Sequence, residues 1–283
     1  FGMVDNILHP SHLRTLIPSL ARQKRKYEIF FESSAVLTAS HLRSLSAAGV
    51  RWLQPGIESL DDDLLRLMGK GTNALRNLQL LKSAREQGIH LTWLLLYGIP
   101  GESDRSYGRM AKWLPWISHL QPPNAMSPIQ FAHFSPYHAH PAAYGLKLAP
   151  ARAYRFIFPF RPAALRRFAA YFENCGRAGE DRLVGAEGRR HPGLRAVFRE
   201  TLLWQRVWQP HLFPEKGGAA GPVLTWKDDG RTLTLHDTRG CAVEKRTSFR
   251  GLPRRIHLLC GEGPTRDELL KSLGVPKKNL DAW

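Results

Sequence analysis

Several residues able to bind a small ligand stand directly after short apolar segments. Glu58 and Ser59 follow residues 50–57, and a turn containing two glycines, a proline and a glutamate follows residues 89–97. A strand-end carboxylate suits a ribose hydroxyl or an ammonium group, and a glycine turn lets the backbone approach a flat ring. If the strands are parallel, these ends converge on one cleft. The full set is Asp5, Asn6, Glu32, Glu58, Ser59, residues 98–102 and Ser135.

Each of these features also has a purely structural interpretation. Residues 98–102 are equally suited to a tight strand-to-helix turn. The Glu58 carboxylate would also favour the positive end of a following helix, and Asp5 is equally placed to cap a helix that begins near Ser11. Taken singly, none of them identifies a ligand.

The cysteines and histidines do not form a metal-binding pattern. Cys175, Cys241 and Cys260 are 66 and 19 positions apart, so they indicate neither a disulfide framework nor a metal site. His133 and its neighbours at 138 and 140 lack a cysteine or carboxylate at ligand spacing. We therefore predict no metal ligands in this chain and a reducing, cytoplasmic location.

The elements that would position these residues alternate between strand and helix. Apolar patterns predict strands at residues 1–6, 27–32, 50–57, 89–97 and 129–134, with helices between them at 11–23, 40–48, 59–69, 72–87 and 103–119. This repetition predicts parallel strands with right-handed crossovers, in a partial barrel or an open sheet. Residues 1–150 form the expected core. The remainder divides into a helical extension and linker (151–221) and a small α+β domain (222–283), with a hairpin at 223–236 and helices at 248–260 and 266–273.

Charge and hydropathy limit the partners. The net charge is +17, with +5 on residues 1–140 and +12 on residues 141–283. The excess fits either a solvated arginine-rich surface or attraction to an acidic peptide. Without a compact basic run interleaved with aromatics we regard nucleic acid as an unlikely partner. No apolar run approaches the ~20 residues of a membrane span, so we expect no membrane.

Longer strings carry a family resemblance. Residues 56–59 (GIES), Lys70 with Gly71, and residues 98–102 (GIPGE) stand in the order and spacing found in the core of the radical S-adenosylmethionine (SAM) superfamily. Residues 30–32, 54–60, 97–102, 119–123 and 134–137 further resemble its cobalamin-dependent branch, and more narrowly the proteins that mature ribosomally made peptides. The resemblance covers about residues 1–140.

The resemblance implies a fold, cofactors and a site. The fold would be α/β, a partial (β/α)6 barrel lacking its first strand, with a smaller α+β C-terminal region. Asp5 would bind the SAM amino group, Glu58 the ribose or methionine moiety, and the glycine turn the adenine. The cofactors would be SAM, a [4Fe–4S] cluster and cobalamin. The implied SAM-binding residues are Asp5, Gln54, Glu58, Ser59, Gly98, Pro100, Gly101, His133 and Ser135, with Lys70 as a weaker candidate.

One departure from the family pattern shapes the functional expectation. The family binds its cluster through C-x3-C-x2-C, just before the strand placed at Phe1, and this chain contains neither that motif nor a cobalamin domain. Because the sequence starts within an expected strand, we expect the C-terminal part of a longer enzyme rather than a degenerate relative, and this chain alone to be inactive. Three clustered cysteines upstream of Phe1 would favour the enzyme.

The expected activity is cobalamin-dependent C-methylation of a ribosomally made peptide. The peptide would be attracted through an acidic leader to the basic C-terminal half. The hairpin and last helix also loosely resemble small winged domains that bind leader peptides, although a structural cap is the interpretation we favour. The alternatives are another radical SAM reaction, such as methylthiolation of tRNA, or a cluster-free protein that binds SAM or a peptide.

Overall fold

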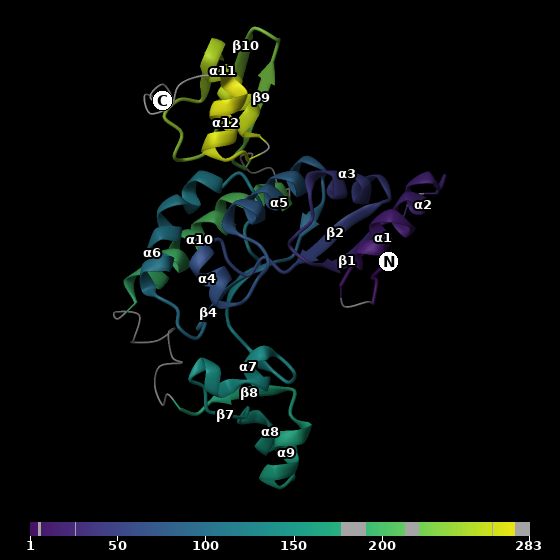
Figure 1. Cartoon of the computed structure of the whole chain (residues 1–283), viewed down its shortest axis with the longest axis vertical. Coiled ribbons are helices and arrows are strands. Elements are labelled where there is room, and N and C mark those ends of the chain that lie inside the picture. The colour runs from purple at the N-terminus through teal and green to yellow at the C-terminus, as the bar shows by residue number, and fades with distance from the viewer. Residues whose placement is uncertain (5–6, 26, 177–190, 213–220, 262, 275–283) are drawn as a thin grey trace.

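A computed structural model describes residues 1–4, 7–25, 27–176, 191–212, 221–261 and 263–274. Asp5 and Asn6 therefore lie outside the described residues. Figure 1 shows three groups of elements along the long axis of the molecule. A parallel α/β layer lies in the middle, a small sheet with α7 to α9 lies at one end, and the C-terminal sheet with α11 and α12 lies at the other.

The central layer is built from parallel strands. β1 (Ile29–Ser33) pairs with β2 (Val50–Pro55), β2 with β3 (His90–Leu91), and β4 (Leu94–Tyr97) with β5 (Ala125–Pro128). The parallel bridge between Glu58 and Leu95 joins the β1–β2–β3 group to β4. At residues 1–6, where a strand was predicted, the described residues show a single parallel bridge, between Gly2 and Phe30 of β1. The fold is thus mixed α/β with parallel strands in the predicted order along the chain.

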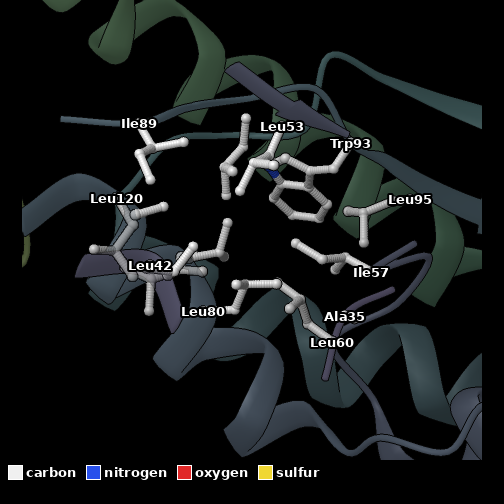
Figure 2. Packing of buried hydrophobic residues seen from close by; sticks show 14 of the residues in the cluster. Ala35, Leu42, Leu53, Ile57, Leu60, Leu80, Ile89, Trp93, Leu95 and Leu120 are labelled. Carbon is white, nitrogen blue, oxygen red and sulfur yellow. The ribbon is translucent and has the colours of Figure 1, made fainter. Parts of the chain in front are cut away.

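Helices cover one face of this layer, and the core lies beneath them. Phe31, Leu53 and Leu95 are about 1% exposed or less, whereas Trp52 on the other face is 48% exposed. Figure 2 shows Leu53, Trp93 and Leu95 among the side chains that fill this core. The covering elements are α3 (Ala39–Ala47), α4 (Asp62–Leu67), α5 (Ala74–Glu86), α6 (Asp104–Trp113), η1 (Leu114–Ile117) and α10 (Pro192–Leu212).

Local chemistry adjusts the predicted helix and strand boundaries. The helix predicted at 11–23 is two helices, α1 (Pro10–Arg14) and α2 (Leu16–Arg22), because Pro18 has no N–H to donate to the carbonyl of Arg14. Asn73, rather than Thr72, caps α5 by accepting the amide of Arg76 at 2.9 Å. The strand predicted at 89–97 is interrupted between β3 and β4.

The structure corrects the strand predicted at residues 129–134. The neighbour of β4 is β5, which ends at Pro128, and the chain then turns away. β6 (Phe131–Ala132) and β7 (Leu148–Pro150) pair instead with β8 (Tyr171–Asn174), in antiparallel fashion. This pairing crosses the boundary predicted at residue 150, and a separate cluster of buried residues supports it. The remaining elements here are α7 (Pro136–Ala139), η2 (Pro141–Tyr144), α8 (Ala153–Ile157) and α9 (Pro162–Phe168).

The C-terminal group is a three-stranded antiparallel sheet with two helices. β10 (Thr232–Asp237) lies between β9 (Leu224–Asp228) and β11 (Arg246–Arg250), followed by α11 (Gly251–Cys260) and α12 (Arg266–Leu273). The helix predicted at 248–260 therefore begins three residues late, because residues 248–250 extend β11. The Sγ of Cys241 lies 3.5 Å from the carbonyl of Pro115, and Arg239 donates to the carbonyl of Trp116, so this group contacts η1.

Candidate functional site

A cavity of about 530 Å³ opens at the carboxyl ends of β1 and β2. Its lining includes Glu32 from the end of β1 and Gln54 from β2, with Glu58 and Lys70 from the segments that follow. The volume lies in the range of sites that enclose a cofactor-sized molecule. Open parallel sheets bind ligands at this end of their strands, where loops are free to vary.

Glu58 has a backbone conformation that few residues other than glycine adopt. Its φ is +60°, in the left-handed region. Neighbouring hydrogen bonds hold it there. The amide of Leu96 donates to the Glu58 carbonyl at 2.8 Å, and the fully buried Asn77 side chain donates to the carbonyls of Ile57 and Ser59 at 3.1 and 2.9 Å. Strain that is maintained by surrounding contacts is common at ligand sites.

The Glu58 carboxylate forms an ion pair with Lys70 inside the cavity. The Nζ of Lys70 donates to Oε1 of Glu58 at 3.1 Å, and the two side chains are 35% and 22% exposed. Gly56 lies against this pair, because a Cβ added there would be 3.5 Å from Oε1 and 3.6 Å from Nζ. The motif that ends β2 and the Lys70–Gly71 motif that follows α4 therefore form one polar wall.

The cavity carries more negative than positive charge. Glu32 and Glu58 contribute carboxylates, and Lys70 contributes the one ammonium group among its lining residues. Gln54, Ser34 and Thr72 add neutral hydrogen-bonding groups. A cationic ligand with hydroxyl groups suits this lining, since a carboxylate binds both an ammonium group and vicinal hydroxyls through charge-assisted hydrogen bonds.

The glycine turn follows β4 and lies outside the lining of this cavity. Gly98 and Gly101 have φ of +76° and +83°, as a turn with glycine-specific conformation requires. The carboxylate of Glu102 accepts the amides of Gly98 and Ile99 at 3.1 and 2.8 Å and the hydroxyl of Tyr107 at 2.5 Å. Space is open on the Cα of Gly98, where an added Cβ would meet no protein atom within 4 Å.

Besides the residues of the glycine turn, three predicted site residues lie outside the cavity lining. Ser59 is 1% exposed, and its hydroxyl accepts the amide of Asp61 at 3.1 Å. His133 stacks on Phe134 and its Nδ1 lies 2.9 Å from the carbonyl of Ala169, while Ser135 caps α7. The last two belong to the β6–β8 sheet, because the strand expected to carry them to the cavity ends before them.

Gln54, Glu58 and Lys70, which the resemblance named, line one cavity together with residues to which the resemblance gave no role. Glu32 ends β1 and was grouped with the strand-end residues, but the family resemblance gave it no role. Thr72 and Thr92 also line the cavity. Thr92 stands in the break between β3 and β4, a position that the apolar pattern of residues 89–97 conceals.

The cysteines lie on separate elements. Cys175 follows β8, Cys241 lies between β10 and β11, and Cys260 ends α11; all three are exposed. Within the described part of the chain, no group of three or more histidine, cysteine, aspartate or glutamate side chains is arranged to hold a metal ion. In the same residues, no helix is long and apolar enough to cross a membrane.

A parallel α/β domain with a ligand cavity at its strand ends is the class that fold and site define. Residues 4–114 match the model of the radical SAM superfamily. This matched segment of the chain contains β1 to β4 and the Glu58–Lys70 pair. A comparison with curated proteins finds no match.

Solved structures of radical SAM enzymes are similar to the chain. The methyltransferase TsrM from Kitasatospora setae is 16% identical over 69% of this chain and 42% of its own, with a TM-score of 0.47. The cobalamin-dependent enzyme OxsB is 19% identical over 43% and 20%, with a TM-score of 0.37. Coproporphyrinogen III oxidase from Escherichia coli is 13% identical over 97% and 65%, with a TM-score of 0.39. This chain thus spans less than half the length of TsrM and OxsB, and at these values the likeness carries no conclusion about activity.

Proposed function

We propose that the cavity binds SAM, and that the chain supplies the SAM-binding part of a radical SAM enzyme that methylates a ribosomally made peptide. The observation that carries the SAM assignment is Glu58, a strained strand-end carboxylate held in a cofactor-sized cavity within the segment that matches the superfamily. The backbone strain at Glu58 is explained if its carboxylate binds a ligand.

The lining fits the chemistry of SAM. Its ammonium and sulfonium groups are cations, which the net negative charge from Glu32 and Glu58 favours. Its ribose presents two hydroxyls, which can donate hydrogen bonds to a carboxylate such as that of Glu58. Lys70 is placed to balance the remaining negative charge or to meet the carboxylate of the methionine moiety. The open space at Gly98 leaves room for a flat ring.

The described residues do not fit a [4Fe–4S] cluster. A cluster needs thiolates that converge on one centre, whereas Cys175, Cys241 and Cys260 lie on different elements. The family match implies a cluster, which reduces SAM to generate a radical when bound, so its ligands must come from residues other than these three. Cobalamin, proposed here as the methyl donor on the resemblance alone, has no ligand among the residues discussed.

The peptide partner rests on charge and on the open edge of the C-terminal sheet. β11 is an edge strand in the described sheet, and its Arg246, Ser248 and Arg250 side chains are exposed. An extended peptide adds to such an edge through main-chain hydrogen bonds. Arginines along the edge favour an acidic leader, and this attraction weakens with salt. We therefore propose β11 as the docking strand for the leader.

Calorimetric titration of SAM into the chain tests the central assignment. We expect Glu58→Gln to weaken binding roughly tenfold, because a hydrogen bond to a charged group contributes about 1.5–3 kcal/mol. Glu86→Gln is the matched control, since Glu86 is also a glutamate in an ion pair, with Lys82 at 2.8 Å, but lies on the surface of α5. Equal affinities of the two variants, or no binding by the unmodified chain, would reject the proposal.

A further inference from the structure

The open face of the parallel layer carries a row of three aromatic rings that the SAM site leaves unused. Phe30, Trp52 and His90 are neighbours in register across β1, β2 and β3. The ring centroids of Phe30 and Trp52 are 6.4 Å apart with planes at 89°, and those of Trp52 and His90 are 4.9 Å apart at 81°. Such edge-to-face contacts fix the rings relative to one another.

This aromatic row is continuous with the cavity. Side chains two positions apart on a strand share a face, so Glu32, Gln54 and Thr92 stand one step further along the same strands, where they line the cavity. The Nε1 of Trp52 donates to Oγ1 of Thr92 at 2.6 Å. This hydrogen bond links the indole to Thr92 in the cavity lining and gives the indole N–H an acceptor.

The central ring of the row is exposed, whereas Phe30 and His90 on either side of it are half-buried. Trp52 is 48% exposed. Trp93, which follows Thr92 in the chain and packs in the core, is 1% exposed. An indole that belonged to the packed core would be buried like Trp93. Burial lowers the pKa of His90, which favours its neutral imidazole. The surface is therefore apolar and rigid, and it adjoins two carboxylates.

We propose that Phe30, Trp52 and His90 form a subsite for an uncharged aromatic side chain of the substrate. Such a side chain would cover the exposed indole and lie within reach of a ligand in the cavity. A pre-positioned aromatic surface binds another ring with little loss of conformational freedom. The inference rests on the proposed function for the nature of the neighbouring ligand, but the row itself is independent of it.

Single amino-acid amides test the subsite directly. The probes are N-acetyl-L-phenylalaninamide and N-acetyl-L-lysinamide, followed by ligand-observed nuclear magnetic resonance with the full chain. We expect the phenylalanine probe to bind, Trp52→Ala to weaken it at least fivefold, and Trp52→Phe to retain most of it. Trp116→Ala is the control, because Trp116 is 62% exposed but lies on η1, and it should bind like the unmodified chain.

Two results would overturn the subsite. They are unchanged binding of the phenylalanine probe to Trp52→Ala, and stronger binding of the lysine probe than of the phenylalanine probe, which would indicate a site for cations. If Trp52→Ala fails to fold by circular dichroism, Trp52→Gln replaces it. SAM titration separates this inference from the proposed function, since Trp52→Ala should bind SAM within twofold of the unmodified chain, and Glu58→Gln should still bind the phenylalanine probe. If the unmodified chain does not bind SAM but binds the phenylalanine probe in a Trp52-dependent way, the proposed function is rejected and the subsite is retained.

Discussion

The Nζ of Lys70 donates to Oε1 of Glu58 at 3.1 Å, across twelve positions of sequence that include the whole of α4. The contact joins a strand end to the segment after a helix, and it fixes the Glu58 carboxylate, whose own backbone is strained at φ +60°. The ion pair and the strained backbone together hold the Glu58 carboxylate in the cavity, and the backbone strain lowers the stability of the fold. This relationship predicts that stability and ligand binding can be separated at Glu58.

Glu58→Gly should stabilise the chain and weaken SAM binding. Glycine adopts positive φ without a Cβ penalty, and relief of that strain is worth about 1 kcal/mol. The same change removes the carboxylate, so affinity should fall roughly tenfold. Urea unfolding and calorimetry measure the two effects. A Glu58→Gly chain that is both less stable and equally able to bind SAM would refute this account of the strain.

The glycine turn gives a second separation. Gly98→Ala places a Cβ at φ +76° in open space, so the protein loses only about 1 kcal/mol of stability. If adenine lies against this turn, as we propose, SAM affinity falls by about tenfold or more. Gly88→Ala is the control, because Gly88 has φ +64° and equally open surroundings but lies at the end of α5, outside the cavity lining. Equal SAM affinities of the two variants would make the turn purely structural.

Iron binding offers a third test. We expect the 283-residue chain to retain no [4Fe–4S] cluster after anaerobic reconstitution, because its three exposed cysteines lie on separate elements. Iron and sulfide analysis with absorption spectroscopy measures this. A triple Cys→Ser variant at residues 175, 241 and 260 is the control and should match the unmodified chain. A stoichiometric cluster that the triple variant loses would contradict the expectation.

Prediction from sequence succeeded where a local pattern determined the structure. The parallel order of strands follows from apolar segments that alternate with capped helices. The contact between Glu58 and Lys70 was not predicted, since the resemblance named Lys70 only as a weaker candidate. It failed at residues 129–134, because the choice between β4 and β8 as partner for this segment depends on residues 171–174, about forty positions away. No local pattern records such pairing. Trp52 was missed for a similar reason, because its exposure depends on which face of the sheet the helices cover.

His119 predicts how stability responds to acid. It lies between the parallel layer and the C-terminal sheet, and its Nδ1 is buried with no hydrogen-bond partner in the described structure. Burial, together with the positive charges of Arg239 and Arg85, lowers the pKa of His119 to about 4, against the opposing effects of Asp237 and the Trp116 backbone. In the unfolded chain the pKa is about 6.5. The unfolded state therefore binds the proton more readily, and the contribution of neutral His119 is complete above about pH 6.5 and lost as the pH falls toward 4.

The resulting prediction concerns the difference between two proteins. The unmodified chain should lose up to about 3 kcal/mol between pH 7 and pH 4 through this group, and His119→Gln should lose correspondingly less over the same interval. His140→Gln, at an exposed histidine, should behave like the unmodified chain. Urea unfolding at pH 7.0, 5.5 and 4.5 measures all three proteins. Parallel pH profiles for the unmodified chain and His119→Gln would show that His119 is protonated in the folded protein as readily as in the unfolded one.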